Sequence, residues 1–154
     1  MLAVVRPDSW NFPLLVHVGG AMLLVASVVV AAVALLQSWR AVDAAASAAL
    51  FRLGALTMFF AALPSYFVMR IGAAWILSRE HLQNSNASWI GIGFATGDGG
   101  GVILLITLIL LGIALRRARR GAPAGTLGRI GSVLALLLVV AYGIAVWAMT
   151  TKPS

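Results

Sequence analysis

The sequence predicts an all-α polytopic membrane protein, an antiparallel bundle of four transmembrane helices with both termini on the outer side. Its 154 residues are 62% hydrophobic and only 10% charged, with a mean hydropathy of +1.02. Soluble domains are about 45–50% apolar and about 25% charged, so this composition excludes a soluble enzyme, a disulfide-stapled secreted module and a disordered chain. We expect a single transmembrane domain over residues 1–154, without a separate soluble domain.

The apolar segments have the length that a membrane span requires. A hydrocarbon core about 30 Å thick needs roughly 20 residues in a helix that rises about 1.5 Å per residue. Four segments meet that length: residues 14–36, 53–77, 89–115 and 130–149. The first begins after Pro13, where a helix tolerates proline, and is longer than the apolar core of a cleaved signal sequence, about 7–15 residues. We therefore expect it to remain as a span.

The later segments carry unusual residues that need an explanation. The second contains Pro64 and a charged residue, Arg70, and the third holds Asp98 within a glycine cluster. The fourth contains no charged residue. The alanine-rich stretch before the second segment, residues 41–51, fits either a short helix at the membrane surface or an extension of the second span.

The placement of basic residues predicts the orientation of the bundle. The net charge is +7, and seven arginines lie in the two connections on one side: Arg40, Arg52, Arg116, Arg117, Arg119, Arg120 and Arg129. The opposite side holds three basic residues: Arg6, Arg79 and Lys152. Because basic residues concentrate in cytoplasmic loops and attract anionic lipids, we expect the arginine-rich side to be cytoplasmic. This placement favours lipid over nucleic acid as the partner of these arginines.

The tryptophans give a second indication of the same register. Indole rings favour the head-group layer of a membrane. Four of them fall at the predicted outer ends of the spans: Trp10, Trp75, Trp89 and Trp147.

Each span carries one polar side chain that we expect in a common layer in the outer half of the membrane. Measured from the nearest outer tryptophan, Arg70 lies about 7–8 Å deep, His17 about 10 Å and Asp98 about 13 Å. Tyr142 lies about 7–8 Å below Trp147. Ionisable residues within a membrane pair with one another, so we predict an ion pair between Arg70 and Asp98. His17 and Tyr142 would complete this ligand- or ion-binding cluster through hydrogen bonds.

Simpler interpretations of the same four residues remain open. Arg70 is near enough to the outer surface to extend its guanidinium into the head groups, and Asp98 fits an outer loop that dips inward around the glycines. His17 fits a packed histidine bonded to a carbonyl of a neighbouring helix. Tyr142 fits an interfacial aromatic residue.

The glycines of the third span also have two interpretations. Gly93, Gly97 and Gly101 recur every four residues, which predicts a helix-packing face that admits a neighbouring backbone. Alternatively, the four glycines between residues 97 and 101 interrupt the helix and expose backbone groups beside Asp98, as in discontinuous transporter helices.

The residues available for metal or haem binding are few. The absence of cysteine excludes thiolate zinc sites and iron–sulfur clusters. His17, near Met22 and Met69, is the one candidate copper ligand within a span, and His81 does not match its depth as a bis-histidine haem requires. No hydrolase or zinc-protease motif is present, so we do not expect an enzyme.

Three stretches of the spans carry a family resemblance: NFPLLVHVGGAMLLV, LPSYFVMRIGAAWILSRE and WIGIGFATGDGGGVILL. They resemble a functionally uncharacterised family of small bacterial four-span membrane proteins that is distantly similar to the CopD-type copper-resistance membrane domain. The resemblance implies the four-span fold, a bacterial inner-membrane location and a link to copper or haem handling.

Three functional hypotheses follow from the sequence. The first is a multi-pass protein of the bacterial cytoplasmic membrane whose outer-leaflet cluster binds or helps to move a proton, an ion or a small polar ligand. The second is an accessory or structural subunit that packs through the glycine face, in a homo-oligomer or a larger membrane complex. The third is a CopD-like copper- or haem-binding membrane protein.

Overall fold

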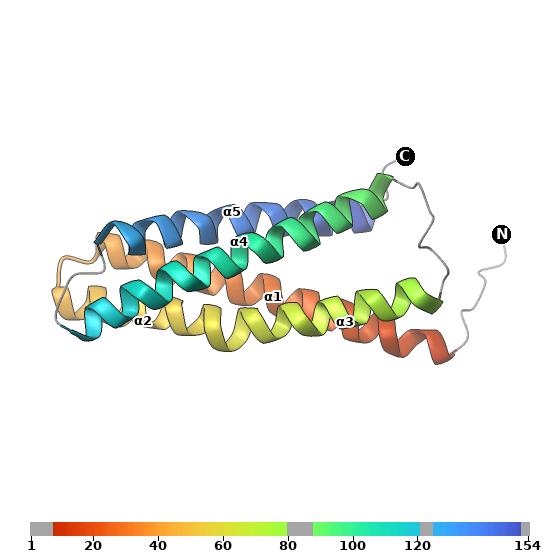
Figure 1. Cartoon of the computed structure of the whole chain (residues 1–154), viewed down its shortest axis with the longest axis horizontal. Helices are drawn as coiled ribbons and strands as arrows, with labels where there is room; N and C mark the ends of the chain where they lie inside the picture. The colour runs from red at the N-terminus through yellow and green to blue at the C-terminus, as the bar shows by residue number, and fades with distance from the viewer. Residues whose placement is uncertain (1–7, 80–87, 121–124, 152–154) are drawn as a thin grey trace.

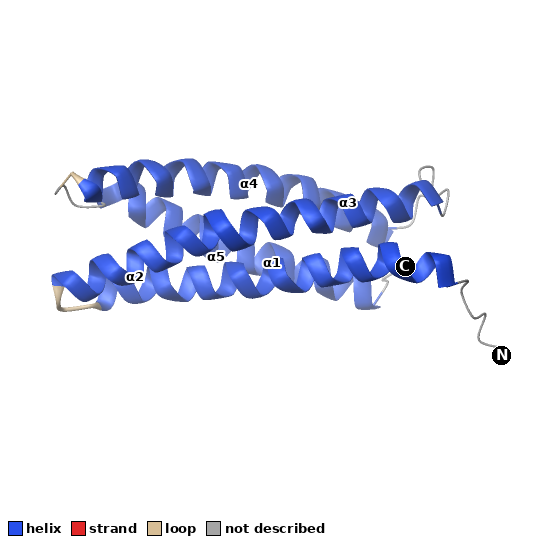
Figure 2. Ribbon diagram, turned by 90° about the horizontal axis from the view of Figure 1, so that it is seen from below, coloured by secondary structure: helices blue, strands red, loops and turns tan. Residues whose placement is uncertain are grey.

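The protein is a long antiparallel bundle of helices, seen here in a computed structural model that describes residues 8–79, 88–120 and 125–151 (Figure 1). Its elements are α1 Asp8–Arg40, α2 Ala44–Thr57, the π-helical turn η1 Met58–Ala62, α3 Leu63–Arg79, α4 Ser88–Arg119 and α5 Gly125–Thr151. These ranges contain helices and short turns without a strand (Figure 2). The predicted all-α class and helical bundle are confirmed.

Four helical rods are long and apolar enough to cross a membrane, which makes this a multi-pass membrane protein. They cover Phe12–Arg40, Ala44–Arg79, Gly91–Arg119 and Gly125–Thr151. The predicted spans 14–36, 53–77 and 130–149 lie within them. The predicted span 89–115 begins two residues before Gly91 and lies within α4. The start of α1 and the end of α5 lie at the same end of the bundle (Figure 1).

The second rod explains how a proline is accommodated in a continuous span. α2, η1 and α3 follow one another without a break over 36 residues. Proline lacks an N–H group, and its ring collides with the carbonyl four residues earlier in a regular α-helix. The wider π-helical turn ends at Ala62, two residues before Pro64, and the Leu63 N–H group donates to the Met58 carbonyl five residues earlier. The π-helical turn therefore accommodates Pro64 without interrupting the helix.

The alanine-rich stretch before this span is an extension of the span rather than a separate surface helix. α2 begins at Ala44, and the carboxylate of Asp43 accepts a hydrogen bond of 2.8 Å from the Ala46 N–H group. This N-terminal cap satisfies one of the backbone donors that every helix start leaves unpaired.

The helices are arranged in a ring in which α1 packs on α2, α3 and α5, and α4 packs on α5. The side between α3 and α4 is the most loosely packed. α1 and α3 approach most closely at two glycines. An added Cβ atom at Gly20 would lie 2.5 Å from the Met69 nitrogen, and one at Gly72 would lie 2.5 Å from the His17 nitrogen. Only glycine permits this backbone-to-backbone contact, as is typical of helix pairs in membranes.

Two buried hydroxyl groups of the core are satisfied within their own helices. The hydroxyl of Thr107 donates to the Ile103 carbonyl at 2.7 Å, and that of Ser132 donates to the Gly128 carbonyl at 2.8 Å. The core is rich in alanine, leucine and valine side chains, among them Leu24, Val28, Leu35, Leu104, Leu111, Ala135 and Leu138. Many large apolar side chains face outward instead, as a lipid environment requires.

The two ends of the bundle differ in chemistry. At one end the Trp75 ring contacts Phe12 edge to face, with ring centres 5.8 Å apart, and the Arg79 guanidinium lies over the same ring. The other end carries exposed arginines, which include Arg40, Arg52, Arg116, Arg117, Arg119, Arg120 and Arg129. Arg6, His81, Lys152 and the side chains of Trp10 and Trp89 lie outside the described residues.

Candidate functional site

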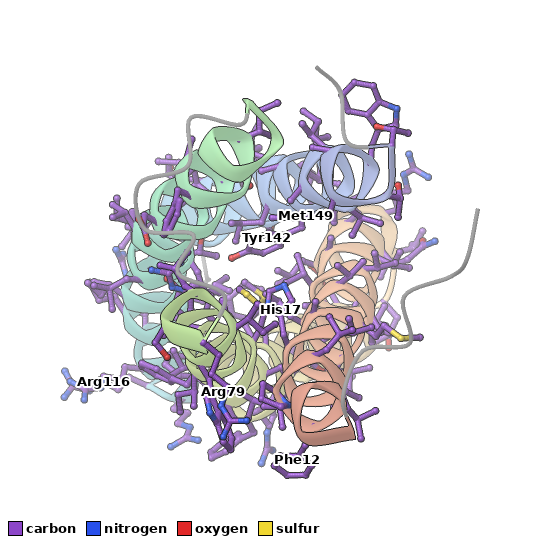
Figure 3. The ribbon with its side chains drawn as sticks, turned by 90° about the vertical axis from the view of Figure 1, so that its right-hand side faces the viewer. Phe12, His17, Arg79, Arg116, Tyr142 and Met149 are labelled. Carbon is purple, nitrogen blue, oxygen red and sulfur yellow. The ribbon has the colours of Figure 1, made fainter. Side chains whose placement is uncertain are left out.

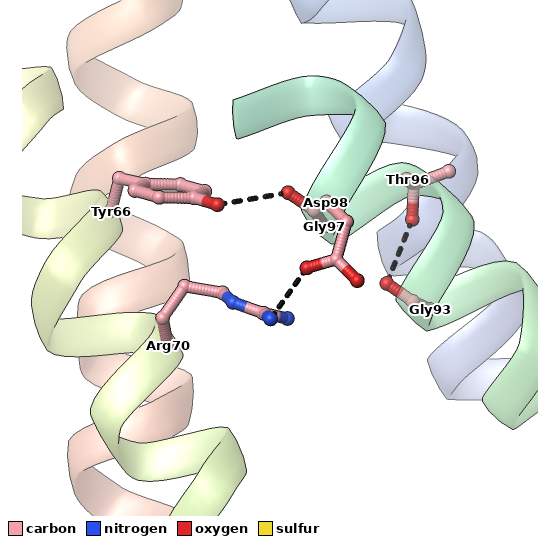
Figure 4. Close-up of polar contacts among 6 residues, drawn as sticks. All are labelled: Tyr66, Arg70, Gly93, Thr96, Gly97 and Asp98. Atoms are coloured by element: carbon pink, nitrogen blue, oxygen red, sulfur yellow. Dashed lines mark hydrogen bonds and ion pairs between the residues drawn. The ribbon is translucent and has the colours of Figure 1, made fainter. Parts of the chain in front are cut away.

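The ion pair predicted between Arg70 and Asp98 is present. Arg70 projects from α3 and Asp98 from α4, and Nη2 of the arginine lies 2.5 Å from Oδ1 of the aspartate (Figure 4). The pair joins the two helices across the loosely packed side of the ring. It is not sealed, because the Arg70 side chain is 32% exposed and the Asp98 side chain is 58% exposed.

The depth of the pair follows from the arginine-rich end of the bundle. Arg70 lies eighteen positions after Arg52 in the sequence, and Asp98 lies eighteen positions before Arg116. At about 1.5 Å per residue, each member of the pair is about 27 Å from that arginine. In a hydrocarbon core about 30 Å thick, the pair therefore lies near the boundary opposite the arginine-rich end. This position explains why two charged groups remain partly exposed in a span.

Tyr66 belongs to the site, although the sequence analysis did not include it. Its hydroxyl group donates to the Gly97 carbonyl at 3.2 Å, directly beside the ion pair (Figure 4). The ring lies against Gly101, where an added Cβ atom would collide with the hydroxyl. The sequence spacing could have predicted its place in the site, because Tyr66 precedes Arg70 by four positions and therefore lies on the same helix face.

His17 does not join the ion pair, so its predicted hydrogen bond to the cluster is wrong. The Nδ1 atom of His17 lies 3.0 Å from the Met69 carbonyl oxygen. A carbonyl can only accept, so the Nδ1–H group of His17 is the donor. The cause is the close approach of α1 and α3, which places the His17 backbone against Gly72 and the ring beside Met69. The packed-histidine interpretation describes this residue correctly.

Tyr142 also differs from its predicted role as a partner of the ion pair. Its ring extends from α5 toward the bundle axis and lies against Gly100, whose added Cβ atom would be 2.8 Å from the ring (Figure 3). The side chain is buried, with 4% exposure, so it is not an interfacial residue either. Within the described residues its hydroxyl has no hydrogen-bond partner.

The glycines of α4 do not interrupt the helix. α4 is continuous over Ser88–Arg119, and the positive-φ glycine of the described chain is Gly125, outside this helix. The discontinuous-helix interpretation is therefore wrong. The packing face exists in a different form, because its glycines admit side chains: Gly93 faces Met149, Gly97 faces Arg70 and Gly101 faces Tyr66. Missing side chains on α4 thus make room for the polar residues of α3.

The copper and haem interpretation concerns His17 and the side chains near it. Within residues 8–79, 88–120 and 125–151, no group of three His, Cys, Asp or Glu side chains is close enough to hold a metal. His17 has already committed one ring nitrogen to a backbone carbonyl. The other ring nitrogen, Nε2, is the one that a metal would bind in this arrangement.

The site therefore consists of Tyr66, Arg70 and Asp98 on the α3–α4 side. His17 is bonded to the Met69 carbonyl, and the Tyr142 ring packs against Gly100. No protein-family model, curated protein or solved structure matches this chain.

Proposed function

We propose that this membrane protein binds a proton, an ion or a small polar ligand at the cluster of Tyr66, Arg70 and Asp98. The observation that carries the proposal is the open ion pair, whose carboxylate is 58% exposed while it bridges two loosely packed helices. Oδ1 of Asp98 faces Arg70, and the exposed carboxylate can also take up a proton or contact a cation. An anion can compete with Asp98 for the guanidinium group.

Binding of a proton or a ligand at the cluster would weaken the contact between α3 and α4. The ion pair and the hydrogen bond from Tyr66 to Gly97 are the polar links between α3 and α4 within the described residues. Protonation of Asp98, or exchange of either charge for a ligand, removes the attraction between the helices. If α3 and α4 can adopt two relative positions, a ligand that binds only one of them increases the population of that position.

This function is tested by comparing Asp98→Asn with Asp43→Asn in purified protein and in proteoliposomes. We expect one of the chloride, phosphate, acetate, sodium or ammonium ions to raise the melting temperature of the parent, or an imposed pH gradient to drive proton entry. Asp98→Asn should abolish a response to sodium, ammonium or protons because the amide cannot be charged. It should strengthen a response to chloride, phosphate or acetate because Arg70 is then no longer paired. Asp43→Asn should retain the response of the parent, because asparagine is an equally good helix cap.

An identical response of the parent and of Asp98→Asn, or no response to any of these ions and to the pH gradient, would contradict binding at the pair. The Asp43→Asn variant controls for a general effect of removing negative charge. The two acidic residues lie toward opposite ends of the bundle, so a local effect is separable from a global one.

We further infer that the arginine-rich end faces the cytoplasm of a bacterial cell and contacts anionic lipids of the inner membrane. Its arginines are exposed and lie at the opposite end from the start of α1. Basic residues are retained on the cytoplasmic side, where anionic head groups attract them.

Cysteine labelling provides a direct test of this orientation. The chain contains no cysteine, so each introduced cysteine reports a single position. In intact cells, an impermeant maleimide should label Ser85→Cys, between α3 and α4, and should not label Gly121→Cys, between α4 and α5. Permeabilised cells, in which both positions should react, serve as the control. The opposite pattern would reverse the orientation.

A second candidate function is that of an accessory subunit whose open ion pair contacts a partner protein. The exposed Asp98 side chain favours it, because a carboxylate in a span is usually enclosed by protein. Purification of a tagged parent in mild detergent should then recover a partner that Asp98→Asn loses and Asp43→Asn retains.

A further inference from the structure

The hydroxyl group of Tyr142 is a buried polar group for which the described residues supply no partner. The side chain is 4% exposed, and it points from α5 into the bundle between α4 and α1 (Figure 3). Native proteins almost always satisfy buried hydroxyls, either with a protein group or with bound water. The requirement is stronger inside a membrane, where bulk water is absent. The Tyr142 hydroxyl therefore indicates a bound hydrogen-bonding partner.

The surroundings of this hydroxyl supply a second polar group. An added Cβ atom at Gly100 would lie 3.2 Å from the Tyr142 hydroxyl oxygen, and one at the adjacent Gly101 would collide with the Tyr66 hydroxyl. The two phenol groups therefore contact α4 at adjacent residues. Because Gly100 and Gly101 have no side chains, the two tyrosine rings can approach the backbone of α4 there.

The hydrogen-bond directions are complementary. Tyr66 donates its hydroxyl proton to the Gly97 carbonyl, so its oxygen is left as an acceptor. Tyr142 has a hydroxyl proton to donate and no described acceptor. A molecule between them must accept from Tyr142 and donate to Tyr66. Water has both capacities and is the smallest molecule that has them.

We propose that a water molecule inside the bundle bridges the hydroxyl of Tyr142 to the hydroxyl of Tyr66. The resulting chain runs from Tyr142 through the water and Tyr66 to the Gly97 carbonyl, one residue before Asp98. It connects the interior of the bundle, at α5, with the backbone beside the ion pair. The bridge shares Tyr66 with the exposed cluster, and it does not require that the cluster bind a ligand.

Phenylalanine substitutions test the bridge through stability. Tyr142→Phe keeps the ring against Gly100 and removes only the hydroxyl. If the hydroxyl holds a bridging water, the melting temperature in detergent should fall by roughly 2–4 °C, because a hydrogen bond is lost. In a Tyr66→Phe background the same change should cause no further fall, since the bridge is already broken. A higher melting temperature for Tyr142→Phe than for the parent would overturn the proposal.

Infrared spectroscopy identifies the bridging molecule as water. In the parent, an O–H stretching band of buried water should shift when the protein is transferred from ordinary water to water labelled with oxygen-18. The band should disappear in Tyr142→Phe and in Tyr66→Phe. It should persist in Ser132→Ala, a control on α5 whose buried hydroxyl bonds to its own helix. Absence of an isotope-sensitive band in the parent would overturn water as the occupant, whatever the melting temperatures.

Discussion

Alanine at Gly20 or Gly72 should destabilise the bundle by about 1–3 kcal/mol, the usual cost of forcing extra atoms into a packed interface. The added methyl group at Gly20 would meet the Met69 backbone nitrogen at 2.5 Å and its Cα atom at 2.9 Å. At Gly72 it would meet the His17 nitrogen at 2.5 Å and the Cα atom at 2.7 Å. These are backbone atoms, which cannot move aside by changing a rotamer. α1 and α3 would therefore have to separate.

The same helices offer matched controls for this prediction. An added Cβ atom meets nothing within 4 Å at Gly19, beside Gly20 on α1, or at Gly99 on α4. Alanine at these positions should leave stability unchanged or raise it by up to about 1 kcal/mol, because alanine favours the helix over glycine. Thermal or denaturant unfolding in detergent gives the comparison. Equal effects at Gly19 and Gly20 would show that α1 and α3 are not in backbone contact.

His17 provides a second measurement for the same variants. Its hydrogen bond to the Met69 carbonyl depends on the close approach that Gly20 and Gly72 permit. A shift of the His17 ring resonances in Gly72→Ala, and none in Gly99→Ala, would show separation of α1 from α3 at this level.

Gly20 and Gly72 show which part of the fold could be predicted from the sequence and which part could not. Four apolar segments of sufficient length predict the helices and their number, because membrane thickness fixes the length of a span. Which glycine meets which helix is not encoded in spacing along one segment. The sequence analysis assigned close packing to Gly93, Gly97 and Gly101, whose regular spacing is conspicuous. The backbone contact instead uses Gly20 and Gly72, which lie on two different helices and show no common spacing.

The candidate site was predictable to a similar extent. Charge in a membrane must be paired, so the link between Arg70 and Asp98 follows from the scarcity of ionisable residues in the spans. The hydrogen bonds of neutral residues do not follow in this way, because backbone carbonyls are available on every helix. His17 and Tyr66 both bond to such carbonyls, and the acceptor depends on the rotation of each helix. Equal depth in the membrane therefore did not bring His17 and Tyr142 to the ion pair.

Arg70 and Asp98 should be energetically coupled, by an amount that their exposure limits. Removing one partner of a fully buried ion pair costs about 3–5 kcal/mol, because an uncompensated charge remains. Here the side chains are 32% and 58% exposed, so solvent and head groups reach the remaining charge. We expect Arg70→Leu and Asp98→Leu each to cost less than a buried pair would, with a coupling of about 0.5–1 kcal/mol between them.

A double-mutant cycle measures this coupling. The variant with leucine at both positions carries no unpaired charge, so it should lose less stability than the sum of the two single changes. The exchanged pair, Arg70→Asp with Asp98→Arg, should recover part of the loss if the two side chains meet across α3 and α4. If Arg70 instead extended into the head groups, its interaction would be with lipid phosphate, and Asp98→Leu would not alter the effect of Arg70→Leu. Strictly additive losses in the cycle would therefore place the arginine with the lipid rather than with Asp98.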